Sequence, residues 1–247
     1  MKLLLNVFLL HLWVLNAPSD CSEQWRNAPG ADDQKELSPK EINLDIRAAD
    51  GLLLKATHYA AAKPGPGMLL LHQCNMDRKS WRSLATALAN SGIHVLTFDY
   101  RGYGETPGRG SLYEHIAADV DSAFAKLISL PGVDKNRVGA GGASCGVSNS
   151  MKLAIRNDKI KALFLLTGPI PQEGVTFIKS HPDVPILAIE NGDEVAAVKE
   201  LDAIMKLSKH PSSIMKAYPN GAHGVPIFKK HPDIIPTVTN WMVNALK

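Results

Sequence analysis

The sequence predicts an α/β fold in which helices cover both faces of a mostly parallel sheet. From residue 41 to the C-terminus, short apolar runs typical of buried strands alternate with segments of helical apolar spacing. This alternation favours parallel pairing, because each helix returns the chain to the same end of the sheet. Two strand-like runs at 42–48 and 52–60 flank Asp50-Gly51, a dipeptide typical of hairpin turns. An antiparallel hairpin is therefore expected at one edge.

The remaining predicted elements alternate in type along the chain. Expected strands cover 67–72, 93–100, 137–143, 160–168, 184–190 and 213–219, and expected helices cover 80–92, 113–130, 148–157, 194–208 and 234–247. Ser80 is the expected N-cap of the first helix, and Gly92 its expected stop. Segment 169–182 has room for one short helix and no lid domain, which predicts an open, shallow site. Residues 41–247 are expected to form a single α/β domain.

The first 40 residues are expected to lie outside this domain. A basic start, an apolar run at 3–15 and small residues after it are typical of a secretory signal. We expect a signal peptide at 1–19, a flexible tether at 20–40, and a secreted or periplasmic protein with no stable membrane span. The residues before Cys21 do not resemble the apolar-then-small pattern of a lipoprotein anchor, so lipidation is not expected there.

Composition excludes several other classes of function. The net charge is +3, and the 27 Lys and Arg residues are scattered along the chain, so nucleic-acid binding is not expected. Three cysteines without CxxC or Cys/His spacing suggest neither a disulfide scaffold nor a metal site. No cofactor is predicted.

A candidate nucleophile lies where the strand at 137–143 turns into a helix. Gly142, Ser144 and Gly146 form the pattern G-x-S-x-G, in which the central side chain projects from a strained strand-to-helix turn. Glycines on both sides relieve the crowding of that turn. With Cys145 at the centre, the β-branched Val147 would occupy a tight position, so Ser144 is the better candidate.

A carboxylate and a histidine follow Ser144 in the order expected for this motif. Asp193 follows the strand at 184–190, and His223 follows the strand at 213–219. The carboxyl ends of parallel strands share one sheet edge, so both side chains should approach Ser144. Glu190 and Glu194 flank Asp193, but their strand-end and helix-start positions favour capping or surface roles.

Five segments in this order resemble the α/β-hydrolase family. They are LLLHQCNMDRKSW at 69–81, VLTFDYRGYGET at 95–106, GASCG at 142–146, AIENGDEV at 188–195 and GAHG at 221–224. The short chain and the ending at 231–242 look most like small, capless, dienelactone-hydrolase-like serine esterases. Two departures are clear. His72-Gln73 stands where His-Gly is common, and Ser144 stands where the name-giving dienelactone enzymes carry cysteine.

The resemblance implies a serine hydrolase acting on a small-molecule ester. Ser144 would attack the carbonyl, His223 would move the proton, and Asp193 would orient His223. The backbone N–H of Cys145 would form one half of the oxyanion hole, and that of Cys74 or Gln73 the other. A peptidase or amide hydrolase with the same triad, or a non-catalytic binding protein on this scaffold, remain alternatives.

The implied oxyanion hole places Cys74 opposite Cys145. In an oxidising compartment the two could form a disulfide that distorts the hole. The alternative, which the sequence favours, is a pair of small buried thiols.

Overall fold

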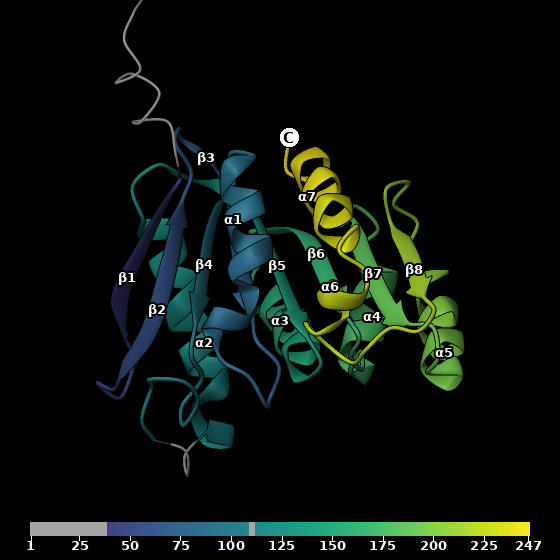
Figure 1. Ribbon diagram of the computed structural model, residues 1–247, viewed down its shortest axis with the longest axis horizontal. Coiled ribbons are helices and arrows are strands. Elements are labelled where there is room, and N and C mark those ends of the chain that lie inside the picture. Colours follow the sequence, from purple (N-terminus) through teal and green to yellow (C-terminus); the bar gives the residue numbers. More distant parts are fainter. Residues whose placement is uncertain (1–38, 109–111) are drawn as a thin grey trace, which may run out of the picture. The chain divides into compact units, whose positions relative to one another are not determined.

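Eight strands form one sheet in the computed structural model, which describes residues 39–108 and 112–247 (Figure 1). The strands are β1 (Lys40–Arg47), β2 (Leu53–Ala60), β3 (Gly65–Leu71), β4 (His94–Phe98), β5 (Val133–Ala143), β6 (Ile160–Leu166), β7 (Ile186–Asn191) and β8 (Ile214–Tyr218). Their order in the sheet is β1-β2-β4-β3-β5-β6-β7-β8. β1 pairs antiparallel with β2, and β2 with β4, while all other neighbours are parallel. The predicted mostly parallel sheet with an antiparallel edge is confirmed.

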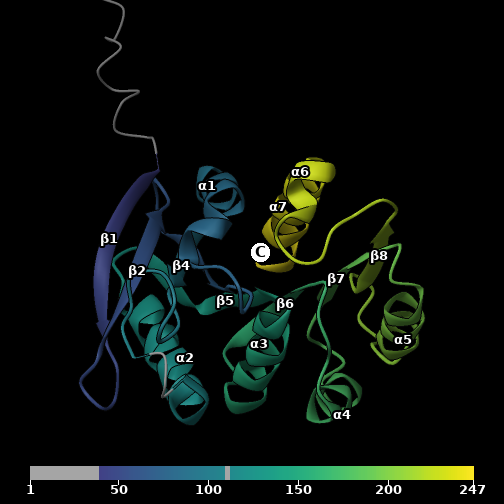
Figure 2. The ribbon, with the colours of Figure 1, turned by 60° about the horizontal axis from the view of Figure 1, so that its bottom comes forward.

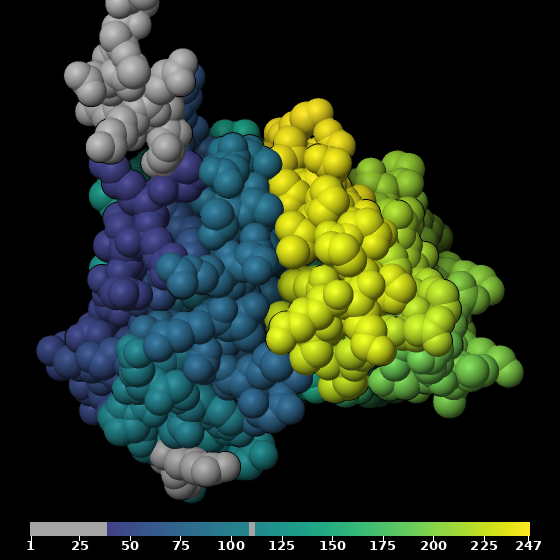
Figure 3. Space-filling model, viewed as in Figure 1, coloured from purple at the N-terminus to yellow at the C-terminus, as the bar shows by residue number. Residues whose placement is uncertain are grey.

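Helices cover both faces of this sheet (Figure 2). One face carries α1 (Arg82–Asn90), α6 (Ile227–Lys230) and α7 (Ile234–Ala245), and the other carries α2 (Leu112–Ser129), α3 (Cys145–Arg156), α4 (Gln172–Ser180) and α5 (Val195–Met205). The last helix, α7, packs against α1, and Figure 3 shows the C-terminal segment in yellow beside the blue segment that contains α1. The chain's end therefore closes one layer of the fold.

Each face of the sheet has its own apolar core. Along β3, Leu69 and Leu71 join the core under α2 and α3, whereas Met68 and Leu70 join the core under α1 and α7. All four side chains are fully buried. A strand that is covered on both faces loses the alternation of apolar and polar residues, which explains the continuous apolar run in the sequence.

The predicted hairpin is present between β1 and β2. Arg47 pairs with Leu53 at its closed end, and Gly51 in the turn has φ +90°. Glycine adopts this left-handed conformation without the steric cost that a Cβ atom would bring. The Asp-Gly dipeptide was thus a sound signal for the turn.

The start of the first helix differs from the prediction. A short 3₁₀ helix, Arg78–Trp81, precedes α1, and the carboxylate of Asp77 caps it by accepting a hydrogen bond from the Lys79 N–H. Ser80 is therefore not the N-cap, because its hydroxyl donates instead to the carbonyl of Asp77 at 2.7 Å. The four-residue helix α6 was not expected, because so short an element has no apolar period of its own.

The segment between β6 and β7 contains α4 and no further helix or strand, as the prediction of a chain without a lid requires. The predicted signal peptide and nearly all of the predicted tether, with Cys21, lie outside the described residues. Among the helices that are described, none combines the length and the apolar character that a membrane crossing needs.

Candidate active site

Ser144 occupies a sharp turn between β5 and α3. Its backbone angles are φ 53° and ψ −121°, which few residues other than glycine adopt. A Cβ atom on Gly142 would lie 2.1 Å from the carbonyl oxygen of Gly146, and one on Gly146 would lie 2.3 Å from that of Leu71. The fold therefore shows why both flanking positions are glycine, since neither has room for a Cβ atom. The turn also packs closely against Leu71 at the end of β3.

His223 lies on the loop after β8 and contacts Ser144. Its Nε2 is 2.8 Å from the Ser144 Oγ, a hydrogen-bond distance. The His223 side chain is 49% exposed, and Ser144 is half-buried. Two side chains from different parts of the sheet meet as the sequence predicted, at an edge that solvent can reach.

Two buried side chains hold the loop of His223 from below. The N–H of Gly224 donates to the hydroxyl oxygen of Thr167, and the N–H of Val225 donates to the side-chain oxygen of Gln73 at 2.8 Å. Thr167 follows β6 and has a positive φ of 42°, and its own N–H donates to the carbonyl of Ile189 at 2.7 Å. The backbone on the C-terminal side of His223 is thus fixed to the ends of two other strands.

The carboxylate beside His223 belongs to Glu194. Glu194 Oε1 lies 3.6 Å from His223 Nδ1 and accepts a hydrogen bond from Asn191 Nδ2 at 3.3 Å. Asp193 is exposed, and its carboxylate accepts a hydrogen bond from the backbone N–H of Asn220 at 3.1 Å. The expectation that Asp193 orients His223 is therefore corrected, because neighbouring side chains at the start of α5 point to different partners.

Glu190 is the third carboxylate at this edge, at the end of β7. It is 3% exposed, and its Oε1 accepts the N–H of Asn191 at 2.8 Å. Burial raises the pKa of Glu190 above its ordinary value. A cavity of about 170 Å³ beside His223 is lined by both Glu190 and Glu194.

The loop after β3 carries Gln73 and Cys74, two of the three residues predicted for the oxyanion hole. His72 Nε2 accepts the N–H of Tyr100 at 3.0 Å, so its Nδ1 carries the proton and donates to the carbonyl of Gln73 at 2.8 Å. Burial lowers the pKa of His72 below its ordinary value, which favours this neutral form. His72 thus connects the loop after β3 to the segment after β4. Within residues 39–108 and 112–247, the backbone N–H groups of Cys74 and Cys145 have no hydrogen-bond acceptor.

Cys74 and Cys145 are joined by a disulfide, with their Cα atoms 6.0 Å apart. The favoured expectation of two buried thiols is wrong, because Cys74 is exposed and Cys145 half-buried. The bridge coexists with the contact between Ser144 and His223. That the bridge distorts the oxyanion hole stays a prediction, because the Ser144–His223 contact lies outside the hole.

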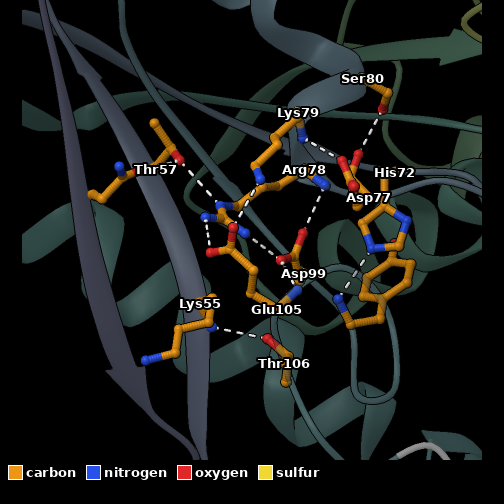
Figure 4. A network of polar contacts seen from close by, with 12 residues as sticks. Lys55, Thr57, His72, Asp77, Arg78, Lys79, Ser80, Asp99, Glu105 and Thr106 are labelled. Atoms are coloured by element: carbon orange, nitrogen blue, oxygen red, sulfur yellow. Dashed lines mark hydrogen bonds and ion pairs between the residues drawn. The ribbon is translucent and has the colours of Figure 1, made fainter.

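A buried ion pair anchors the far end of the same loop (Figure 4). The guanidinium of Arg78 contacts the carboxylate of Asp99, whose side chain is fully buried, and its Nε donates to Thr57 Oγ1 at 3.1 Å. The backbone N–H of Arg78 also donates to Asp99 Oδ1 at 2.7 Å. Side-chain hydrogen bonds from Lys79 and then Arg78 lower the pKa of Glu105 to about 2. The network connects the loop to β2 and to the segment after β4.

A cavity of about 460 Å³ opens at Ser144. Its lining residues are mostly apolar or aromatic, with a few polar groups: Cys74, Tyr100, Leu112, Tyr113, Ile116, Ser144, Cys145, Ser148, Asn149, Lys152 and Pro169. A volume of this size suits a small molecule. Among the described residues, no group of three or more His, Cys, Asp or Glu side chains is placed to hold a metal ion.

Two supporting residues were not anticipated from the sequence. Thr167 precedes Gly168, where a Cβ atom would lie 2.4 Å from the carbonyl oxygen of Ser144, and Asn191 orients Glu194. For Thr167 a signal was available in the sequence, namely the Thr-Gly pair at the end of a buried strand. No sequence pattern marks the second, because its role depends on a contact between side chains.

Comparisons with known proteins identify the family of this chain. A sequence model of the alpha/beta hydrolase fold family matches residues 66–223, more than half of the chain. An uncharacterised protein from Mycobacterium tuberculosis is 31% identical over 150 residues, which cover 60% of this chain and 52% of that protein. A thiohydrolase from Aspergillus aculeatus is 25% identical over 174 residues, which cover 68% and 52% of the two chains. The chain thus matches about half the length of these curated relatives.

Solved structures share the fold at low sequence identity. A dienelactone hydrolase from Anabaena variabilis superposes with a TM-score of 0.70 and 18% identity, over 85% of this chain and 100% of that one. An esterase from Pyrococcus furiosus superposes with a TM-score of 0.68 and 17% identity, over 86% and 94%. With the strained serine turn, the strand order and the family match together, the chain belongs to the α/β-hydrolase family.

Proposed function

We propose that the protein is a serine hydrolase that cleaves carboxylic esters through an acyl-enzyme on Ser144. The observation that carries the proposal is the 2.8 Å contact between His223 Nε2 and Ser144 Oγ. A serine hydroxyl is a weak nucleophile until a neighbouring base accepts its proton. Ser144 has a strained backbone and lines the 460 Å³ cavity, in which the substrate carbonyl is proposed to bind.

The remaining steps follow from the neighbours of His223. As Ser144 attacks the carbonyl carbon, His223 takes the hydroxyl proton and later gives it to the leaving alcohol. Glu194 stabilises the imidazolium that forms between these two transfers and favours the tautomer that leaves Nε2 free to accept. A water molecule then attacks the acyl-enzyme, with His223 again as the base, and the carboxylic acid leaves.

The oxyanion is proposed to bind between two backbone N–H groups. Cys145 is at the first turn of α3, where N–H groups have no partner within the helix. Cys74 presents the second N–H from the loop after β3, with Gln73 as the neighbouring candidate. Each such donor is typically worth about 3 kcal/mol of transition-state stabilisation.

The substrate is proposed to be a small ester with a reachable carbonyl. The apolar wall of the 460 Å³ cavity, with Leu112, Ile116 and Pro169, suits a short hydrocarbon or aromatic group. The absence of a lid between β6 and β7, among the described residues, leaves no tunnel there for a long acyl chain. The likeness to an esterase and a dienelactone hydrolase supports ester chemistry at the level of the fold.

Fluorophosphonate labelling of the purified protein tests the proposal. Covalent labelling of wild type, its loss in Ser144→Ala, and its retention in Ser148→Ala are expected. Ser148 is the matched control because it lines the same cavity, but its hydroxyl donates to the carbonyl of Pro169. Absence of labelling in the folded wild type would contradict an activated serine. A panel of paired esters and amides then separates an esterase from an amide hydrolase.

The proposed compartment is the periplasm or the outside of the cell, reached through residues 1–19. Expression of the full chain in a bacterium with two membranes, followed by N-terminal sequencing of the mature protein, tests this. A new N-terminus at Asp20 in the periplasmic or secreted fraction is expected. An uncut chain that stays in the cytoplasm would contradict export.

A further inference from the structure

The disulfide between Cys74 and Cys145 joins the two segments that carry the proposed oxyanion donors. The cysteines are 71 residues apart in sequence. One belongs to the loop after β3, and the other directly follows Ser144. Both line the cavity that contains Ser144. The bridge therefore links the two backbone segments covalently.

Cys74 itself is held to the rest of the fold by its disulfide, while hydrogen bonds hold the residues around it. Its neighbours are anchored, since Gln73 is tied to Val225 at 2.8 Å and Arg78 is tied to Asp99. Cys74 itself is exposed and makes no hydrogen bond to any described residue. The peptide unit that carries the Cys74 N–H is held on its carbonyl side, where the Gln73 oxygen accepts hydrogen bonds from His72 Nδ1 at 2.8 Å and from the Met76 N–H at 3.1 Å. The bond to Cys145 adds a covalent link between this peptide unit and the turn at Ser144.

Oxyanion donors act only when their geometry is fixed before the reaction, because a mobile dipole must be reoriented in the transition state. A shift of about 1 Å in such a group can cost on the order of 10²-fold in rate. We infer that the Cys74–Cys145 disulfide is a positioning device that holds the oxyanion hole in its working geometry. The inference rests on the proposed function, since it assigns a role within that ester hydrolysis.

A consequence is that thiol reductants, which break the Cys74–Cys145 bond, lower the activity. A dithiol attacks the exposed sulfur of Cys74, the Sγ–Sγ bond breaks, and a mixed disulfide forms transiently. The second thiol of the reductant then releases Cys74. The products are two protein thiols and an oxidised, cyclic reductant, so two electrons and two protons pass to the protein. The loop then loses its covalent link to the turn at Ser144.

The test measures kcat and KM for p-nitrophenyl acetate before and after reduction with dithiothreitol. Thiols are counted with Ellman's reagent in Cys21→Ser, which retains only the two bridging cysteines. Reduction is expected to raise the count from none to two and to lower kcat by about tenfold or more, with KM changed by less than about twofold. Removal of the reductant and reoxidation with oxidised glutathione should restore kcat in the same sample.

Cys74→Ala provides the second arm. Its kcat is expected to equal that of the reduced wild type and to stay unchanged when dithiothreitol is added. The kcat of Cys21→Ser should equal that of the wild type both before and after reduction. Thermal unfolding of each protein shows whether it is folded at the assay temperature. The reversible reduction of wild type decides the question if Cys74→Ala does not fold.

A transition-state analogue separates positioning from general stability. A trifluoromethyl ketone forms a tetrahedral adduct with an activated serine, and its affinity should fall with reduction by the same factor as kcat/KM. A change in melting temperature with unchanged kcat and unchanged analogue affinity would overturn the inference. A rise in kcat after reduction would also overturn it, since the bridge would then hold the hole closed.

Failure of the proposed function has a different signature. In that case neither the oxidised nor the reduced wild type hydrolyses the ester or reacts with a fluorophosphonate, although Ellman's reagent still reports the bridge. The inference would then fall with the proposed function. Ester hydrolysis that is lost in Ser144→Ala but is indifferent to confirmed reduction refutes the inference alone.

Discussion

Glu194 Oε1 lies 3.6 Å from His223 Nδ1, whereas the adjacent Asp193 bonds to the backbone N–H of Asn220. Two carboxylates that are neighbours in sequence therefore have different partners. An acid beside the second nitrogen of a catalytic histidine favours one tautomer and stabilises the charged ring. The proposed mechanism assigns that position to Glu194 at the start of α5, whose carboxylate accepts a hydrogen bond from Asn191.

The first prediction separates these two carboxylates. Glu194→Gln is expected to lower kcat on an ester by on the order of 10²- to 10⁴-fold, because the amide no longer stabilises the imidazolium. Asp193→Asn is the matched control and should change kcat by less than about threefold, since its bond to Asn220 is exposed. Steady-state kinetics of the two variants checks this. The reverse order of effects would return the acid role to Asp193.

The second prediction concerns the hydroxyl of Thr167 beneath the histidine loop. Thr167→Val keeps the shape of the side chain but removes the acceptor for the buried N–H of Gly224. The free energy of unfolding should fall by about 1–3 kcal/mol, the cost of an unsatisfied buried donor. We also expect kcat to fall about tenfold, because Gly224 directly follows His223 and its hydrogen bond to Thr167 helps to position that residue.

Thr176→Val on α4 is its control. That hydroxyl is exposed and bonds weakly to the carbonyl of Gln172 at 3.4 Å. Urea unfolding and ester kinetics should leave this variant close to wild type. Equal effects of the two substitutions would show that the hydrogen bond from Gly224 to Thr167 adds nothing particular to stability or to kcat.

The third prediction compares two cations that share Glu105. Arg78→Met leaves the fully buried carboxylate of Asp99 without its charge partner and should cost about 3–5 kcal/mol of unfolding free energy. Lys79→Met removes a pair whose two side chains are 62% and 51% exposed, and should cost less than about 1 kcal/mol. Urea titrations of both variants provide the measurement. Similar losses would mean that burial does not set the strength of this network.

The fourth prediction is a loss of stability in acid that depends on His58. This side chain is 4% exposed, and its Nε2 lies 3.2 Å from His94 Nδ1. Burial, and then the charge of His94, lower the pKa of His58 from 6.5 to about 4. In the unfolded chain the His58 ring takes up a proton near pH 6.5. The contribution of the neutral, buried ring to the unfolding free energy is therefore complete above that pH. It is lost as the pH falls from 6.5 towards 4, by up to roughly 3 kcal/mol.

His58→Gln can still donate to His94 but does not titrate. Its unfolding free energy should therefore decline less between pH 7 and pH 4.5 than that of wild type. Urea unfolding at several pH values gives both curves. Parallel curves would show that His58 does not contribute to the acid sensitivity.

Short-range patterns explain why so much of the fold was predictable. The run of β3, the Asp50-Gly51 turn and the glycines around Ser144 each report a local condition: burial on two faces, a left-handed residue, or a close backbone approach. Parallel strands then bring their following loops to one edge, so the meeting of Ser144 and His223 could be expected from element order alone. The cap at Asp77 was missed because Ser80 and Asp77 are both acceptable capping residues.

What the sequence by itself determined was the order of the elements, the serine at the strained turn and the histidine that reaches it. These follow from periodicity and steric fit within a few residues of each position. Only the tertiary structure decided that Glu194 rather than Asp193 meets His223, that Thr167 and Gln73 hold the histidine loop, and that Cys74 is bonded to Cys145. Each of these depends on the direction of one side chain across a gap between loops, where a rotation of a single backbone unit changes the partner.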